Sequence, residues 1–121
     1  MLIDLEGFAV YPDKIDRAKE WMQYLRSHQA EVDATLIPEH MQLEHIFSIN
    51  FAGRFYLCWY SNQTAMAPDV TTSSNPVDIQ HVKFWQECID EHVPSLKSNL
   101  ENTFQPPETL NSDNVIVFLN T

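Results

Sequence analysis

A small α+β fold built on an antiparallel sheet is predicted by three features of the sequence. Residues 41–61 contain two stretches of β-branched and aromatic residues around a short turn with a glycine, which is typical of a hairpin. Residues 14–35 and 76–92 place apolar side chains at the spacing of helices that are buried on one side. Two further strands are predicted near the ends of the sequence, at 2–11 and 115–119.

The hairpin at 41–61 is the densest aromatic and β-branched part of the sequence. Its first arm alternates apolar and polar residues with period two, which predicts a strand with two unlike faces. Its second arm is apolar or amphipathic on both sides, which is typical of a strand inside a sheet. The face expected to pack on the helices consists of Leu43, His45, Phe47, Phe55, Leu57 and Trp59. The other face, expected to line a dimer interface or a pocket, consists of Glu44, Ile46, Ser48, Tyr56 and Tyr60.

The first strand and the first helix occupy the region before this hairpin. Gly7 lies in the middle of the strand, where a missing side chain indicates close approach by a packed helix or a bulge. The apolar stripe after it predicts one helix from about residue 14 to about residue 35, and Pro38 prevents its continuation.

The second helix is predicted from about residue 76 to about residue 92. Pro76 suits the first helical position, because proline there lacks only a donor that would be unpaired anyway, and Ser74 or Asn75 can cap the helix. Residues 95–114 are predicted to form a short helix followed by a covering loop, because helical spacing gives way to two consecutive prolines.

The predicted order is strand, helix, strand, strand, helix, strand, which is the ferredoxin-like β-α-β-β-α-β arrangement in one domain spanning 1–121. Two helices cover only one face of its four-stranded sheet. The other face would expose Phe8, Ile46, Tyr56 and Tyr60, a larger apolar patch than a soluble monomer normally leaves in water. We therefore expect a homodimer of the dimeric α+β barrel type.

The composition of the chain argues against several classes of partner and site. Seventeen acidic residues against seven lysines and arginines give a net charge of −10, so the surface repels phosphate backbones and anionic lipid. Nucleic acid and membranes are therefore not expected as partners. Cys58 and Cys88 are too few and too scattered for a disulfide framework or a Cys-rich zinc site. With no signal-like or membrane-spanning apolar run, a soluble cytoplasmic protein is expected.

Several short motifs carry a family resemblance. They are Ala34-Thr-Leu36 followed by Glu39, then Leu43-Glu-His-Ile-Phe47, then Pro76-Val-Asp78-x-x-His81 opening a helix that contains Glu87-Cys88. Over about residues 9–92 the chain resembles DUF6176, a bacterial family of unknown function. It departs from the family in the loop around Pro68, where the family has a helix, and at 95–114, which resembles an insertion. The resemblance implies a ferredoxin-like, dimeric fold and carries no mechanism.

Glu44 is the first candidate for chemistry. Adjacent strand residues point to opposite faces, so Glu44 and His45 cannot act as a pair. We expect Glu44 to share a face with Ser48, Tyr56, Tyr60, Glu6 and Asp4. A carboxylate in a partly dry aromatic cavity has a raised pKa and can act as a general acid or base, with Tyr56 or Tyr60 as its partner. The simpler interpretation is a solvated or interface carboxylate that is hydrogen-bonded to a tyrosine.

His45 and His81 are both predicted to face the core, where they could meet. Together with Asp78 or Glu39 they would supply ligands for a divalent metal. No HExxH or comparable spacing is present, and a histidine on an apolar face is more often a packed core residue. No metal and no cofactor are therefore expected, and His45, His81, Glu6 and Ser48 are candidates for ligand contacts.

Two functions remain open at this point. The first is a non-catalytic dimeric protein that binds a small apolar or aromatic ligand between sheet and helices. The second is a cofactor-independent enzyme of the monooxygenase, isomerase or dehydratase type that uses Glu44 with a tyrosine as acid and base. The first is preferred, because the sequence shows no tight catalytic constellation.

Overall fold

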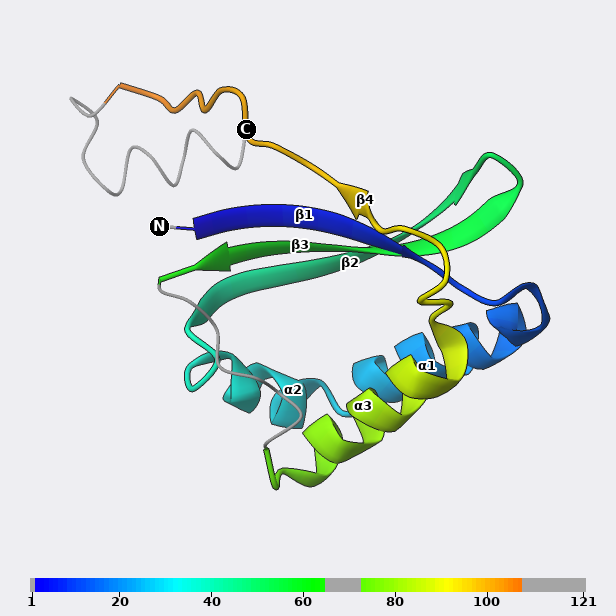
Figure 1. The fold of residues 1–121 in the computed structure, drawn as a ribbon. Coiled ribbons are helices and arrows are strands. Elements are labelled where there is room, and N and C mark those ends of the chain that lie inside the picture. The colour runs from blue at the N-terminus through cyan, green and yellow to red at the C-terminus, as the bar shows by residue number, and fades with distance from the viewer. Residues whose placement is uncertain (1, 65–72, 108–121) are drawn as a thin grey trace.

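The computed structural model describes residues 2–64 and 73–107 (Figure 1). The sheet has the strand order β2-β3-β1-β4, and all its neighbouring strands are antiparallel. The strands are β1 (Leu2–Ala9), β2 (Met41–Phe51), β3 (Arg54–Gln63) and β4 (Leu96–Lys97). The helices are α1 (Ile15–Ser27), α2 (Gln29–Leu36) and α3 (Pro76–Cys88), preceded by a 3-10 turn, η1 (Pro12–Lys14).

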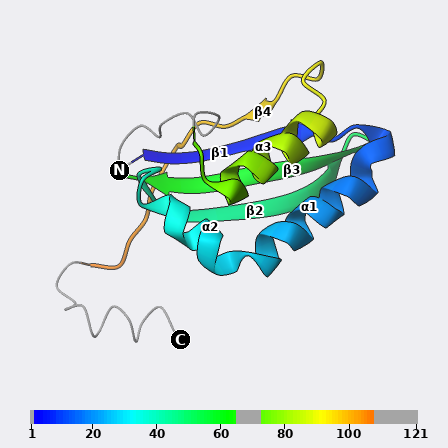
Figure 2. The same cartoon turned by 90° about the horizontal axis from the view of Figure 1, so that it is seen from below.

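The sheet is open, and the three α-helices lie on the same face of it (Figures 1 and 2). The predicted α+β class and antiparallel sheet are therefore confirmed. The strand predicted at 115–119 and the loop around Pro68 lie outside the described residues. Among the described helices, none is both long enough and apolar enough to cross a membrane.

The first helix differs from the prediction because it is broken at His28. The backbone there has φ −116° and ψ 35°, so α1 ends and α2 begins at this residue. A ring nitrogen of His28 lies 2.8 Å from the carbonyl oxygen of Tyr24, and the two rings are 4.1 Å apart. The backbone N–H of His28 donates to the carbonyl oxygens of both Tyr24 and Leu25, at 3.1 and 3.2 Å, and α2 begins at the next residue.

The second helix begins as predicted and ends earlier. The side chain of Asn75 accepts a hydrogen bond of 2.9 Å from the backbone N–H of Val77, which is the expected N-cap. The helix ends at Cys88, because Ile89 forms a β-bridge with Val10 and continues in extended conformation. Backbone bonds to the end of β1 thus replace the predicted last helical turn.

The segment after α3 is a strand, and the short helix predicted at the start of 95–114 is wrong within the described residues. β4 pairs with the edge of β1, where Gly7 lies opposite Leu96. Ser98 Oγ also donates a hydrogen bond to the carbonyl oxygen of Leu5. The unpaired backbone groups of an edge strand are satisfied in this way, which outweighs a weak helical spacing.

The core lies between the sheet and helices α1 and α3. Trp21 and Leu57 are fully buried in it, together with Val10 and Cys88. The inward face of β3, with Phe55, Leu57 and Trp59, packs on this core as predicted.

The faces of β1 and β2 are the reverse of the prediction. Phe8 packs into the core against Trp85, at 4.7 Å between ring centroids, and Ile46 packs beside it opposite Trp59. Leu43 and Phe47 lie on the open face, where they are 41% and 53% exposed. Alternation in β2 shows which residues share a face, but both of its faces carry apolar side chains, so it does not show which face the helices cover.

Gly7 is needed for close packing on the open face of the sheet. The two reasons predicted for it, a packed helix or a β-bulge, are both wrong. A Cβ atom at this position would lie 2.9 Å from Cys58 Sγ and 3.4 Å from the Cβ of Leu96. The glycine therefore leaves room for the side chains of Cys58 and Leu96, which come from the two strands that flank β1.

Candidate functional site

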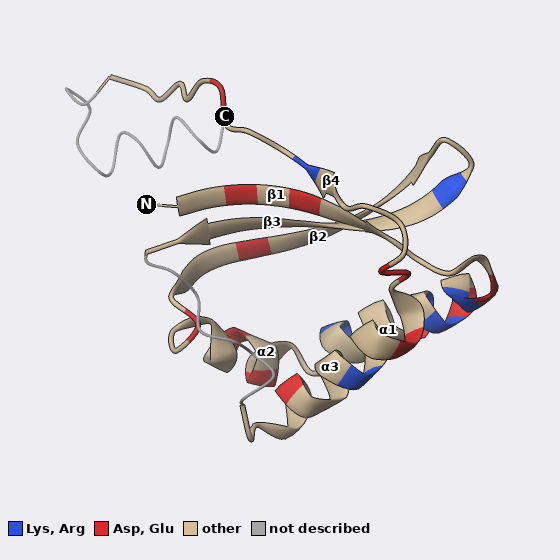
Figure 3. Cartoon of the chain, in the orientation of Figure 1, with Lys and Arg blue, Asp and Glu red and all other residues tan. Residues whose placement is uncertain are grey.

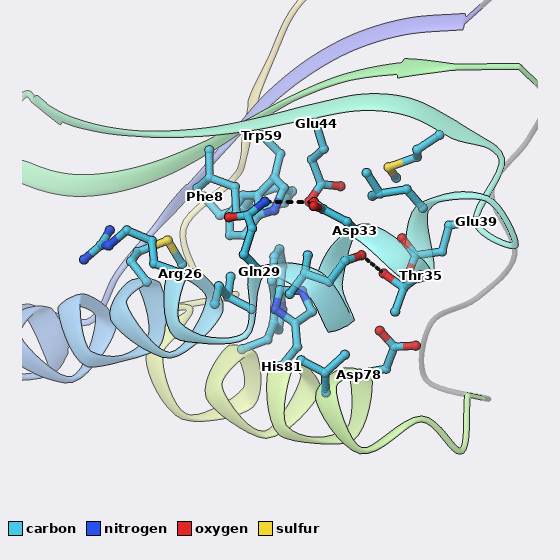
Figure 4. Close-up of a pocket in the computed structure, with 18 residues that line it drawn as sticks. Phe8, Arg26, Gln29, Asp33, Thr35, Glu39, Glu44, Trp59, Asp78 and His81 are labelled. Atoms are coloured by element: carbon cyan, nitrogen blue, oxygen red, sulfur yellow. Dashed lines mark hydrogen bonds between the residues drawn. The ribbon is translucent and has the colours of Figure 1, made fainter.

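A cavity of about 580 Å³ lies between the sheet and the three helices. Its walls are mainly apolar, with Phe8, Ile46 and Trp59 from the sheet, Met22 and Leu25 from α1, and Trp85 from α3. Figure 4 shows Glu44 and Trp59 projecting from the sheet toward the side on which His81 and Asp78 lie. This size and this mixture of aromatic walls with few polar groups are typical of a small-molecule site.

Glu44 enters the cavity from β2. The cause of its position is the register of β2, which turns Glu44 and Ile46 to the helices. Burial raises the pKa of Glu44 to about 7, and the negative charge of Glu39 adds to this effect. The carboxyl group is therefore close to half-protonated at neutral pH, which is the condition for a general acid or base.

His81 enters the cavity from the opposite wall, on α3. Its Nδ1 accepts a hydrogen bond of 3.0 Å from the indole N–H of the fully buried Trp21. The proton of the neutral ring must then be on Nε2. Burial lowers the pKa of His81, and the charge of Asp78 opposes this shift only in part. At neutral pH the ring is an uncharged hydrogen-bond donor at its Nε2 edge.

Two further carboxylates lie at the end of the cavity formed by α2 and the start of α3. Asp78 is 8% exposed and lies in the first turn of α3, where the helix dipole favours a negative charge. Glu39 is half-buried in the connection between α2 and β2. Its pKa is raised by burial and by the charge of Asp78, while a hydrogen bond with Thr35 opposes the shift.

The opening of the cavity carries exposed polar side chains. Gln29 Nε2 donates a hydrogen bond of 2.8 Å to Asp33 Oδ1 across one turn of α2 (Figure 4). Arg26 also lies at this opening, and its guanidinium donates to Gln23 on its own helix at 3.0 Å.

Of the catalytic and ligand-binding candidates selected from the sequence, the cavity contains Glu44 and His81, and Glu39 and Asp78, which were considered there as metal ligands, also line it. Tyr56 and Tyr60 lie on the opposite face of the sheet from Glu44, so the predicted pairing of Glu44 with a tyrosine does not form within one chain. Tyr56 is buried under the segment that contains Val93 and Leu96, and Tyr60 stacks on His45.

The other three ligand-binding candidates are outside the cavity. His45 is exposed on the open face. Ser48 lies on the helix-facing side of β2 but is exposed. Glu6 is on the same side of the sheet, and its carboxylate accepts a hydrogen bond of 2.6 Å from Ser95 Oγ.

The two histidines do not meet, because His45 is on the open face and His81 is under the sheet. The metal site considered from the sequence therefore lacks its central pair. Within residues 2–64 and 73–107, no group of three His, Cys, Asp or Glu side chains is placed to hold a metal ion.

Several lining residues were missed or assigned another role from the sequence. Trp59 was expected to pack on the helices and Trp85 was not selected, but both pack on the core and also form cavity wall. Gln29 and Asp33 were not selected, because both are exposed polar residues, and the break at His28 places them at the cavity. The position of Trp85 four residues after His81 was the available signal, since residues at this spacing share a helix face.

Comparison with known protein families matches residues 1–110 to the family of unknown function DUF6176. The chain belongs to the DUF6176 family. The match extends beyond residues 9–92, where the sequence motifs lie, to β1 and to most of the segment at 95–114. No curated protein matches the chain.

We predict that the DUF6176 protein loses stability as Glu44 ionises. Because the folded pKa of about 7 exceeds the ordinary value of 4.5, the contribution of Glu44 to stability is complete below pH 4.5 and is lost as pH rises through 7. The free energy of unfolding of Glu44→Gln, measured relative to that of wild type, should therefore be about 2 kcal/mol higher at pH 8 than at pH 5, after allowance for partial exposure. Chemical denaturation across this range measures the difference.

The matched control is Glu31→Gln, at an exposed carboxylate of α2 outside the cavity. Its difference from wild type should stay constant with pH. Parallel pH profiles for wild type and Glu44→Gln would contradict the raised pKa.

Proposed function

We propose that this DUF6176 protein is a homodimeric, ferredoxin-like small-molecule-binding protein with its ligand site in the cavity under each sheet. The observation that carries the proposal is a cavity of about 580 Å³ with three aromatic rings and the partly buried Glu44 and His81 in its lining. Apolar walls supply binding free energy, and the few polar groups orient the ligand. The free, buried thiols of Cys58 and Cys88 support a reducing, cytoplasmic location.

Dimerisation is supported by the open face of the sheet. Its outward side chains include Leu5, Leu43, Phe47, Ile49 and Phe51, each between 39% and 55% exposed. An apolar surface of this extent is unfavourable in water. Packing the open faces of two copies against each other would form a dimeric α+β barrel and would leave the cavity of each copy on the outer side.

A second candidate function is acid–base catalysis without a cofactor, of the monooxygenase, isomerase or dehydratase type. The pKa of about 7 at Glu44 favours it. His81 is the available partner in place of a tyrosine, because its Nε2–H can donate to a substrate oxygen while Glu44 removes a proton.

We predict that small aromatic compounds bind in the cavity and are displaced when it is filled. In saturation-transfer NMR, a set of such compounds should give hits with wild type that Ile46→Trp loses, since Ile46 lines the cavity. The matched control is Phe47→Trp, because the neighbouring residue points to the open face. Hits that survive in Ile46→Trp, or no hits at millimolar concentration, would contradict the proposal, provided that thermal unfolding shows both variants folded.

We predict that the catalytic function, if present, exchanges ligand protons with solvent. Incubation of the NMR hits with protein in D₂O should then replace an acidic C–H proton by deuterium, and Glu44→Gln should abolish this exchange. Unchanged ligand spectra after incubation with wild type would leave binding as the function and exclude proton abstraction from these compounds.

We predict that the protein sediments as a dimer at micromolar concentration and that Phe47→Asp converts it to a monomer. A carboxylate at Phe47 would be desolvated in the barrel interface. Ile37→Asp is the matched control, because Ile37 is 83% exposed and lies at the end of α2, away from the sheet. A monomeric wild type would rule out the barrel.

A further inference from the structure

Carboxyl groups outnumber cationic groups in the lining of the cavity. Asp33, Glu39, Glu44 and Asp78 all line it. All seven lysines and arginines of the chain lie within the described residues, and of these only Arg26 is in the lining. Arg26 is exposed at the opening and bonds to Gln23 of its own helix, so it leaves the inner carboxylates uncompensated.

The other cations are in different parts of the molecule. Lys14 and Arg17 pair with Glu87, and Arg54 pairs with Asp90. Figure 3 shows Lys and Arg on α1. In α2 and β2, which border the cavity, the only Lys, Arg, Asp or Glu residues are acidic. In the described part of the chain, Glu39, Glu44 and Asp78 make no ion pair. Besides burial, the charge of Glu39 raises the pKa of Glu44, and the charge of Asp78 raises the pKa of Glu39.

The aromatic wall offers a complementary surface. The rings of Phe8, Trp59 and Trp85 lie 4.7 to 5.9 Å apart, and all three line the cavity. Faces of tryptophan and phenylalanine attract organic cations, most strongly where water is excluded. A ligand with an apolar body and a positive group would contact the rings with its body and the carboxylates with its charge.

The arrangement does not suit a bare metal ion. The described residues contain no cluster of three suitable ligand side chains, and about 580 Å³ is far larger than an ion. An anionic ligand would be repelled by the inner carboxylates and would meet only the peripheral Arg26.

We propose that the cavity selects small organic cations, namely amines carried on an aromatic or apolar body. This inference rests on the proposed function, because it names the ligand class for the same cavity. A bound ammonium group beside Glu44 stabilises the carboxylate, so binding releases the proton that Glu44 carries in the free protein.

The pH dependence of cation binding follows from Glu44 and the titratable and charged groups around it. Glu39, Asp33 and Arg26 lie on the side of α1 and α2, and Asp78 and His81 lie on α3. Ser61 lies beside Glu44 on β3, with Asp4 of β1 beyond it. As pH falls through about 7, Glu44 gains a proton, and His81, whose pKa is lowered by burial, does so at lower pH; both changes weaken the attraction for a cation.

The test uses three probes of one shape, 2-phenylethylamine, 2-phenylethanol and phenylacetate, measured by isothermal titration calorimetry with the full chain. We predict that the amine binds at least about tenfold more tightly than the alcohol and that phenylacetate binds more weakly than either. At pH 7, titrations in two buffers of different ionisation enthalpy should show release of about half a proton per amine bound.

Two variants assign the effect to the cavity. Glu44→Gln should abolish the proton release and most of the preference for the amine, and Glu31→Gln should retain both. Proton uptake on binding, or equal affinity for the alcohol and the amine, would overturn the cation proposal while leaving the cavity as a small-molecule site. No binding of any of the three probes at millimolar concentration would count against both proposals.

Discussion

The indole of Trp21 is the side chain on which the cavity depends. It is fully buried and lies within 6.1 Å, between ring centroids, of Trp59, Phe84 and Trp85. These contacts hold α1 and α3 against β3 at one end of the sheet. The N–H of the same indole fixes which nitrogen of His81 carries a proton. Packing of the core and the chemistry of the site are therefore determined by one residue, which buries a large apolar surface and still satisfies its single donor.

Acidic residues in a partly apolar cavity oppose folding, since desolvation and repulsion both act against their charged forms. Asp78 is partly compensated by the start of α3, but Glu44 lies on a strand and receives no such help. A glutamine or leucine in its place would fit the β2 strand at lower electrostatic cost. Residues that conflict with the local rules of stability in this way are concentrated at functional sites. The conflict at Glu44 is the physical reason to regard the cavity as a site and not as a packing defect.

Much of the fold follows from patterns that involve neighbouring residues. The hairpin, the inward face of β3 and the cap at Asn75 were predicted because alternation, apolar character and turn or cap chemistry are local. The orientation of β2 was predicted incorrectly. Glu44 and Ile46 face the helices only through the pairing of β2 with β3, and that pairing depends on the whole sheet. The break at His28 lies in the backbone conformation of a single residue, which helical periodicity does not encode.

Because strand orientation depends on pairing across the whole sheet, the sequence shows only part of the site. Glu44 was selected because a carboxylate in a partly dry aromatic cavity would have a raised pKa, although a solvated or interface carboxylate was the simpler interpretation. Its neighbours were assigned incorrectly, since reversing β2 replaces Tyr56 and Tyr60 by His81 and Asp78. A cavity formed by three strands and three helices has no sequence pattern of its own.

The strand order of the sheet affects how the chain folds. The β2–β3 hairpin pairs residues that are close in sequence, whereas β1 must join β3 across the whole of α1, α2 and β2. Contacts between distant segments form more slowly than local ones. During that interval the hairpin has two apolar faces in water and two unpaired edges, one of which β2 retains in the folded chain. Nascent chains are therefore most prone to aggregate through this hairpin.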